Sequence, residues 1–365
     1  MKKILALILC VCMALTLVAC GTQEKPNTDG ADTTNTPAGE NTPAAEAEYK
    51  LGMGVVVSMD SSKAGNAQVD ATVATVVTDA EGKIVVCRID VAQNKMNVAD
   101  GAVEADKKFE TKMELGDRYG MAPVKIDNDK NGVTKEWYEQ AKAFEAYVVG
   151  KTGAEVAALE TQEAGGHQIA VDKALLDAGC SMQITDFMAA VAEACKDEQG
   201  MTFKTAEEFT LGVAAISAAA DSKAATAEEN GLVAMYTDFA ATVVADGKIL
   251  AALNDAIQPK ITIDAKGEIV EKTFKATKRV LKGEYGMAPV KIDNDKNGVT
   301  KEWFEQSAEF SKFVVGKTAA EITALETQEA GGHQIAVDKA LLDAGCSIQI
   351  TGIQAVVALA VANAR

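Results

Sequence analysis

The stretch LETQEAGGHQIAVDKALLDAGCS occupies residues 159–181 and returns unchanged at residues 325–347. A second block, YGMAPVKIDNDKNGVTKEW, occupies residues 119–137 and returns unchanged at residues 285–303. The period is far longer than that of solenoid repeats, which stack units of roughly 20–45 residues. The sequence therefore predicts two tandem homologous domains rather than an array of small stacked units.

The predicted domains cover residues 49–199 and 200–365, and each begins with strand-like segments. Those of the first copy are rich in β-branched residues and are separated by turns that contain glycine. They are residues 51–58, 67–78 and 83–91. Strands that precede helices along the chain favour an α+β fold, in which an antiparallel sheet is packed by helices.

Helical periodicity follows the strands in each copy. In the first copy, Thr134 can cap a helix over residues 135–149. The apolar residues that recur at helical spacing in this segment are Trp137, Ala141, Phe144 and Val148. We expect the aromatic residues of this stripe, and Trp303 in the second copy, to pack in a core rather than against a ligand.

A second, short helix is predicted where Thr152 and Glu155 form a capping box. Further on, residues 181–184 alternate between apolar and polar side chains, which predicts a strand. Thr185 or Asp186 can then cap a final helix.

The net charge of −17 excludes nucleic acid as a partner, because binding to a phosphate backbone depends on Lys and Arg. Residues 1–19 have the basic start and the short apolar run of a signal peptide. The sequence LVACG ends this segment and resembles a bacterial lipobox, so Cys20 is expected to carry the lipid. Residues 20–48 are rich in Thr, Pro, Asn, Ala and Glu and are predicted to form a disordered tether. We therefore expect a lipid-anchored protein on the outer face of the cytoplasmic membrane.

The order of elements resembles that of FMN-binding domains in surface lipoproteins of Gram-positive bacteria, which are related to the FMN-carrying subunit of sodium-pumping quinone reductases. The segments that carry the resemblance are LGMGVVVS, GKIVVCRIDVAQNK, KEWYEQAKAFEAYVVGKT and LLDAGCSMQITDFMAAVAEA. In this family a flavin transferase joins the FMN phosphate to a hydroxyl near the end of an Asp-x-x-Ser-Gly-Ala-Thr pattern. The resemblance implies two FMN groups in this chain.

The attachment pattern falls on the Gly-Cys-Ser step of each copy. Leu175, Ala178, Gly179, Cys180 and Ser181 occupy its Asp, Ser, Gly, Ala and Thr places, so that only the glycine matches and the serine keeps the hydroxyl. The implied attachment site of the second copy comprises Gly345, Cys346 and Ser347. A turn that leads into a strand is the alternative interpretation of both steps.

Glycine lets the backbone approach a bulky nucleotide closely. We expect exposed amides around Gly179 and Cys180, with the start of the final helix, to hold the phosphate. The candidates for the slot of the flavin ring are Met182, Phe187 and Met188 in the first copy, and Ile348, Ile353 and Gln354 in the second.

Two further patterns admit a functional interpretation. The sequence DNDKNG begins like a calcium loop, but the closing glutamate is missing, so a solvated loop is the alternative. The candidate ligands are Asp127, Asp129 and Asn131, and Asp293, Asp295 and Asn297 in the second copy. His167 and His333 follow Gly-Gly in matching loops, at the edge of the flavin site or simply on the surface.

The resemblance implies an electron carrier rather than an enzyme in its own right. Electrons would come from a membrane NADH or quinol oxidoreductase and would leave to ferric iron, soluble flavin or a partner reductase. One alternative is a cofactor-free surface module that binds a wall polymer or a small solute. In this alternative, calcium could stabilise the module. Another is that the cleaved signal peptide is a pheromone precursor.

Overall fold

The longest strands of the first copy form a β-meander whose turns are set by local chemistry. In the turn between the second and third strands, the Asp79 carboxylate accepts hydrogen bonds from the N–H groups of Glu81 and Lys83, and Gly82 takes a positive φ of 76°. The computed structural model describes residues 45–122, 134–288 and 300–365. It contains antiparallel sheets packed by helices, which confirms the α+β prediction.

The elements of the first copy follow the predicted order of strands and helices. They are β1 (Ala47–Ser58), β2 (Asn66–Thr78), β3 (Ile84–Asn97), η1 (Ala99–Gly101), α1 (Lys112–Leu115), η2 (Gly116–Tyr119), α3 (Trp137–Tyr147), α4 (Gly153–Ala157), β4 (Thr161–Ala164), β5 (His167–Ala170), α5 (Lys173–Asp177) and α6 (Thr185–Lys196). Helices α1 and α5 and the short β4–β5 hairpin were not predicted.

The second copy repeats this order with additional short strands. Its elements are β6 (Met201–Thr205), β7 (Thr210–Ala218), β8 (Gly231–Ala234), β9 (Tyr236–Ala245), β10 (Lys248–Ile257), β11 (Lys260–Ile263), β12 (Ile269–Thr273), α7 (Lys278–Leu281), η3 (Lys282–Tyr285), α9 (Trp303–Phe313), α10 (Ala319–Thr323), β13 (Thr327–Ala330), β14 (His333–Ala336), α11 (Lys339–Asp343) and α12 (Thr351–Ala362). The sheet of the first copy has the order β3-β2-β1-β6, so it takes in one strand that follows the first copy in the sequence, and the sheet of the second has the order β10-β9-β7.

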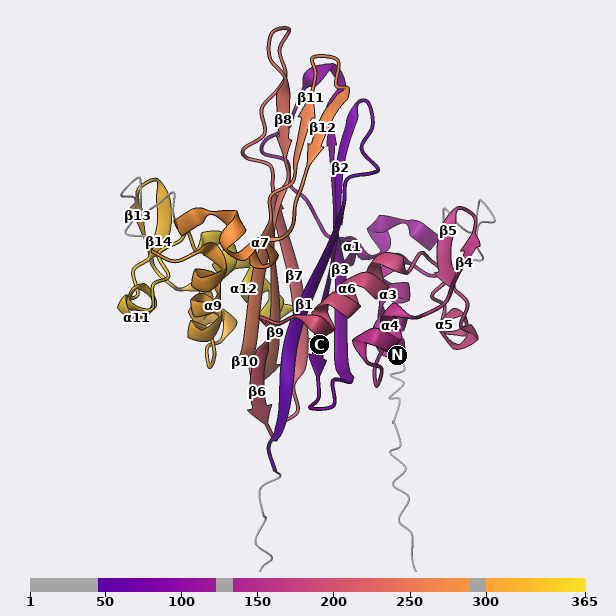
Figure 1. The fold of residues 1–365 in the computed structure, drawn as a ribbon, viewed down its shortest axis with the longest axis vertical. Helices are drawn as coiled ribbons and strands as arrows, with labels where there is room; N and C mark the ends of the chain where they lie inside the picture. The colour runs from indigo at the N-terminus through magenta and orange to yellow at the C-terminus, as the bar shows by residue number, and fades with distance from the viewer. Residues whose placement is uncertain (1–44, 123–133, 289–299) are drawn as a thin grey trace, which may run out of the picture. The chain divides into compact units, whose positions relative to one another are not determined.

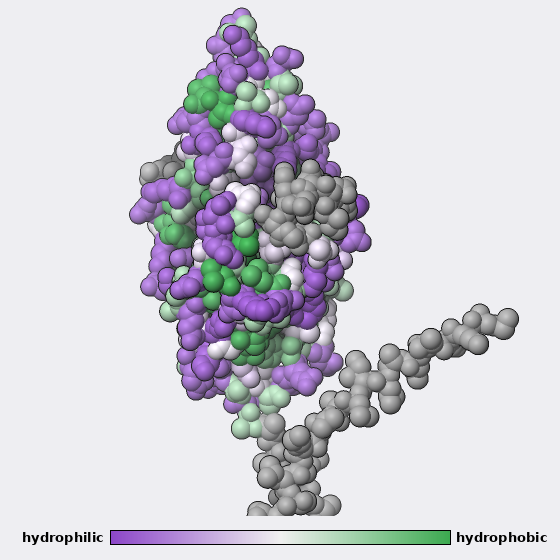
Figure 2. Space-filling view, turned by 90° about the vertical axis from the view of Figure 1, so that its right-hand side faces the viewer, coloured by the Kyte–Doolittle hydropathy of each residue, from purple (hydrophilic) through white to green (hydrophobic). Residues whose placement is uncertain are grey.

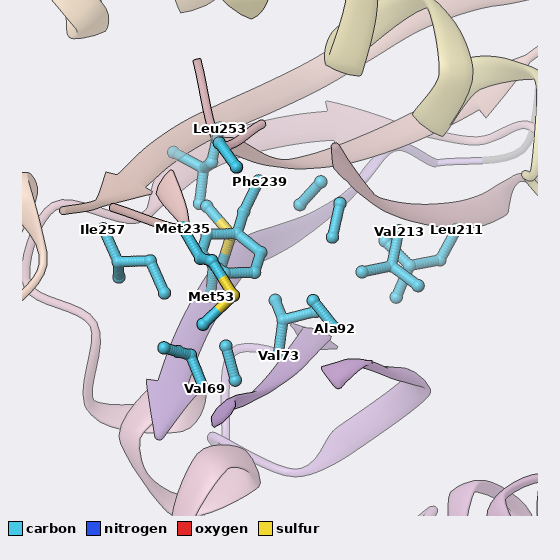
Figure 3. Close-up of a cluster of buried hydrophobic side chains, with 14 of the residues drawn as sticks. Met53, Val69, Val73, Ala92, Leu211, Val213, Met235, Phe239, Leu253 and Ile257 are labelled. Carbon is cyan, nitrogen blue, oxygen red and sulfur yellow. The ribbon is translucent and has the colours of Figure 1, made fainter. Parts of the chain in front are cut away.

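The two sheets pack face to face. Side chains at alternate positions of β1 and β2 meet those of β7, β9 and β10 in one apolar cluster, with Phe239 fully buried at its centre. Figure 3 shows Met53, Val69 and Val73 of the first copy lying against residues of the second in this cluster. The copies therefore share a core, and residues Ala44–Arg365 form one compact unit.

The opposite face of each sheet is covered by the helices of its own copy. Helices α3 and α6 bury the first sheet around Phe144, and α9 and α12 bury the second around Phe310. Figure 1 shows the strands in the centre with the helices of the two copies on opposite flanks. The result is four layers in the order helix, sheet, sheet and helix. The flank that carries the first copy's helices is largely hydrophilic, with apolar patches between the polar side chains (Figure 2).

Three local predictions are wrong, one about a strand and two about helix caps. Residues 181–184 form no strand but link α5 to α6, although Met182 and Ile184 are buried as the alternation required. Helix α3 is capped not by Thr134 but by Glu136, whose carboxylate takes part in a capping box with Glu139.

The predicted capping box between Thr152 and Glu155 is present at the start of α4. Helix α6 begins at Thr185, with no side-chain cap, so neither Thr185 nor Asp186 has the predicted capping role. Within the described ranges, no helix is both long enough and apolar enough to cross a membrane.

Candidate functional site

Each copy contains a cavity at the same place, where the outer face of its sheet meets the first turn of its last long helix. The cavity of the first copy has a volume of about 460 Å³ and that of the second about 650 Å³. Both volumes lie in the range of small-molecule pockets, roughly 300–1,000 Å³. The residues that line both cavities at equivalent positions are Lys112, Tyr119, Met121, Trp137, His167, Met182, Gln183 and Phe187, and Lys278, Tyr285, Met287, Trp303, His333, Ile348, Gln349 and Ile353.

A lysine lies over two aromatic rings in each cavity. The Lys112 Nζ is 5.1 Å from the ring centroid of Tyr119 and 5.5 Å from that of Trp137. In the second cavity, Lys278 lies 5.0 Å from the Tyr285 ring and 5.1 Å from the Trp303 ring. Among the residues that the structure places, neither lysine forms a salt bridge. Each ammonium group is therefore held by cation–π contacts and remains available to a ligand.

A buried aspartate anchors the helix that carries each lysine. Asp90, on β3, accepts hydrogen bonds from the N–H groups of Val91 at 2.7 Å and Met113 at 3.1 Å. In the second copy Asp255 accepts them from Ala256 at 2.8 Å and Arg279 at 3.0 Å. Burial raises the pKa of Asp90 to about 6, although the hydrogen bonds from Thr111 and the backbone oppose this shift.

The contribution of Asp90 to the free energy of unfolding should therefore decrease as the pH rises from about 4 to about 6, because in this interval the native state still binds a proton that the unfolded state has lost. The shift from 3.8 to about 6 corresponds to about 3 kcal/mol. In Asp90→Asn we expect the decrease in the free energy of unfolding across this interval to be smaller by roughly this amount. Urea denaturation at several pH values measures it. Asp177→Asn, at an exposed position, is the control, and equal pH profiles for Asp90→Asn and the wild type would contradict the prediction.

The Gly-Cys-Ser step lies beside the cavity in both copies. Ser347 lines the second cavity. In the first copy Ser181 is not a lining residue, but its neighbour Met182 is. Both serines are half-buried. Within the described part of the chain, neither serine hydroxyl makes a hydrogen bond, whereas the Ser181 N–H donates to Gln140 Oε1 at 3.0 Å and the Ser347 N–H to Gln306 Oε1 at 2.8 Å.

The expectation of exposed amides around this step is wrong. The Gly179 N–H donates to the Leu176 carbonyl at 2.9 Å, and the Cys180 N–H donates to the Leu175 carbonyl at 3.1 Å. Both groups close the end of α5, which the sequence analysis had not predicted. Glycine is nevertheless required here, since Gly179 and Gly345 have φ values of 91° and 86°.

The two cysteines of these steps point into the cores. Cys180 and Cys346 are fully buried, and burial raises the pKa of each thiol to about 12. A thiol that keeps its proton at neutral pH is a poor nucleophile. The structure therefore gives these side chains a packing role next to the serines.

The slot residues divide into two groups. Met182 and Phe187 line the first cavity, and Ile348 and Ile353 line the second, as expected for a ring-binding slot. Met188 does not line a cavity, and the Gln354 side chain instead donates hydrogen bonds to the carbonyls at the end of α10, among them that of Ile322 at 2.8 Å. Met188 instead packs against the core of the first copy.

Of the remaining candidates, the structure places the histidines and the tryptophans but not the calcium ligands or the lipidation site. His167 and His333 line the cavities, and Trp137 and Trp303 contribute both to a core and to a cavity wall. The candidate calcium ligands Asp127, Asp129, Asn131, Asp293, Asp295 and Asn297 lie outside the described residues, as does Cys20. Among the described residues, no group of three or more His, Cys, Asp or Glu side chains could hold a metal ion.

Sequence reasoning missed the carboxyl groups of the cavities. Asp186 lines the first cavity and Asp238 the second, and burial raises the pKa of both. The Asp186 pKa is raised further by Asp70, and Lys112 opposes the shift. A comparison of the two copies in sequence pairs Asp186 with Gly352 and Thr72 with Asp238, and it gives no sign that the two carboxyl groups reach the same place.

No family model matches the chain, and no solved structure matches it. Chlorophenol reductase of Desulfitobacterium hafniense is 35% identical over 132 residues, a match that covers 31% of this chain and 38% of that protein. The matched region thus spans well under half of either protein.

Proposed function

We propose that the protein carries one FMN in each cavity, esterified to Ser181 and Ser347, and that it transfers electrons at the outer face of the membrane. The observation that carries the proposal is that each copy places a serine hydroxyl without a hydrogen bond to any described residue beside a cavity with aromatic walls. The partial similarity to a reductase is compatible with a redox role.

The residues present fit FMN in size and in chemistry. A flat ring system suits a wall formed by Trp137, Tyr119 and Met182 in the first cavity, because aromatic and apolar side chains exclude water from its faces. In each Gly-Cys-Ser step, the serine hydroxyl is the only side-chain group that can form a phosphoester.

FMN would supply the electron-transfer chemistry in these cavities, and the chain would supply its position and its surroundings. The Trp137 and Trp303 walls exclude water from one side, and the lysine on each wall provides a positive charge beside the ring. Gln140 and Gln306 hold the backbone of the serine step against α3 and α9. This arrangement keeps the attachment point rigid relative to the cavity.

The proposed pathway begins at a membrane NADH or quinol oxidoreductase and ends at an external acceptor such as ferric iron or soluble flavin. A lipid on Cys20 would keep the carrier near its donor, and the residues before β1 would act as the tether, which ends earlier than predicted because Ala47 and Glu48 already pair with β6. A flavin transferase would attach the cofactors.

Co-expression with a flavin transferase tests the proposal. The intact mass of the wild-type chain should increase by two FMN groups, and the denatured band should fluoresce on a gel. Ser181→Ala and Ser347→Ala should each lose one FMN, and the double variant should lose both. Ser58→Ala, which removes another hydroxyl from the first cavity, should retain both. A wild-type chain that keeps the mass of the bare polypeptide and binds no free FMN would contradict the proposal and favour a cofactor-free binding module.

A further inference from the structure

The two cavities differ by a reciprocal exchange of one carboxyl group. Strand pairing places Thr72 opposite Val56 in the first copy and Asp238 opposite Ile216 in the second, so Thr72 and Asp238 are equivalent positions. On the last helix, the second residue is Asp186 in α6 but glycine in α12. One copy therefore has its acid on the helix and the other on the strand.

The exchange is also reciprocal in space. A Cβ atom added to Gly352 would overlap with Oδ2 of Asp238. The strand-borne carboxyl group of the second cavity thus lies in the space beside the helix where the Asp186 side chain begins in the first. Each cavity therefore has a carboxyl group at this point, carried by the helix in the first copy and by the strand in the second, in addition to Asp70 in the first cavity and Asp221 in the second.

Both carboxyl groups are available to a ligand. Within the described ranges, the side chains of Asp186 and Asp238 make no hydrogen bond and no salt bridge. Lys112 influences the first group electrostatically and Lys278 the second, without direct contact. An acceptor and a donor of opposite charge therefore lie apart on the walls of the same cavity, as they would for a ligand that binds between them.

The chemistry of these walls selects a class of ligand. The aromatic rings favour a planar apolar face, the ammonium group donates to a carbonyl oxygen, and the carboxylate accepts from an N–H group. A quinone has the carbonyl but lacks the N–H, and a dianion would be repelled by the carboxylate.

We propose that Asp186 with Lys112, and Asp238 with Lys278, bind the edge of a planar heteroaromatic ring on which a carbonyl group adjoins an N–H group. In the flavin ring this edge is the imide of the pyrimidine part. The assignment rests on the proposed function only for the identity of the ring. The four side chains are binding residues, and the interchange of strand and helix preserves their arrangement.

The two tryptophans allow each cavity to be observed alone. The chain has two tryptophans, Trp137 in the first cavity and Trp303 in the second. In Trp303→Phe the fluorescence reports the first cavity, and in Trp137→Phe it reports the second. Riboflavin is the probe, added to the full chain in mild detergent, because it has the ring but no phosphate and cannot be esterified. Quenching of the tryptophan fluorescence gives the dissociation constant.

In the Trp303→Phe background, Asp186→Gly should weaken riboflavin binding roughly 10- to 100-fold, the effect of a lost hydrogen bond to a charged group. Adding Thr72→Asp should restore binding, since it recreates the arrangement of the second cavity. In the Trp137→Phe background, Asp238→Thr should weaken binding and added Gly352→Asp should restore it. Riboflavin methylated at the imide nitrogen should bind weakly and should be insensitive to Asp186→Gly.

The outcomes separate this inference from the proposed function. Glu81→Gln, an exposed position, should leave binding unchanged. Riboflavin binding that is unaffected by Asp186→Gly and Asp238→Thr would overturn the inference and leave the flavin proposal standing. Binding that is lost in these variants but not restored by the second substitution would overturn the reciprocal assignment. If riboflavin does not quench the tryptophan fluorescence of the wild type and the chain gains no FMN mass, both this inference and the proposed function are contradicted.

Discussion

Replacing Arg279 with alanine should lower the free energy of unfolding by about 3–5 kcal/mol, the typical cost of removing one partner from a buried ion pair. Arg279, on α7 of the second copy, contacts both carboxylate oxygens of Asp197 at 3.2 and 3.0 Å, just after α6 of the first. Its guanidinium also donates to the Gln199 carbonyl at 2.9 Å. The side chains are only 7% and 9% exposed, so the variant would leave a carboxylate without its counter-charge away from water.

The chain offers a matched control for this variant. Arg118 forms a bidentate pair with Glu110 at 2.6 and 3.0 Å, but the two side chains are 63% and 49% exposed. Arg118→Ala should lower the free energy of unfolding much less than Arg279→Ala does, because water solvates the remaining carboxylate. Urea denaturation of both variants measures the difference. If Arg279→Ala lowers the free energy of unfolding no more than Arg118→Ala does, the ion pair between Arg279 and Asp197 is not formed in solution.

A second contact of this kind lies between the last helix of the second copy and the first copy. Arg365 donates to both oxygens of Glu145 at 3.0 and 2.9 Å, and the buried Glu145 also accepts the Ile89 N–H at 2.8 Å. Each copy thus extends a residue that follows its last helix to a charged partner in the other. These contacts hold together the sheets whose outer faces carry the cavities.

Gly212→Ala should destabilise the protein by about 3 kcal/mol, at the upper end of the usual cost of overpacking. A Cβ atom at this position would overlap with the carbonyl oxygen of Ala360 on α12. The same close approach occurs in the first copy, between Gly52 and the carbonyl of Ala194 on α6. Because the atom in the way is backbone, the helix itself must move. Its first turn lines the second cavity, so ligand binding should weaken there as well.

Gly283→Ala is the control for this variant. Gly283 has an ordinary φ, and a Cβ atom there would meet no other atom within 4 Å. We expect its free energy of unfolding to lie within about 0.5 kcal/mol of that of the wild type, as is usual for surface substitutions. Denaturation curves for Gly212→Ala and Gly283→Ala that coincide would show that α12 is not seated on β7 as the structure places it.

The sequence alone determined the elements whose signals are local. Alternation and β-branching predict β1, β2 and β3, and helical spacing predicts α3 with its buried stripe from Trp137 to Val148. The repeated blocks predict that any site exists twice. The resemblance directed attention to Met182 and Phe187, which the structure brings into the first cavity.

The tertiary structure decided what depends on partners distant in the sequence. Residues 181–184 have the alternation of a strand but not its pairing, because the N–H groups of Ser181 and Ile184 donate to the Gln140 side chain and the Gln168 carbonyl. Burial of alternate side chains is a property of the segment itself, whereas a strand requires a neighbour. The equivalence of Asp186 and Asp238 likewise appears only when helix and sheet are packed. One carboxyl group can reach the same point from either element, and only the packed chain defines that point.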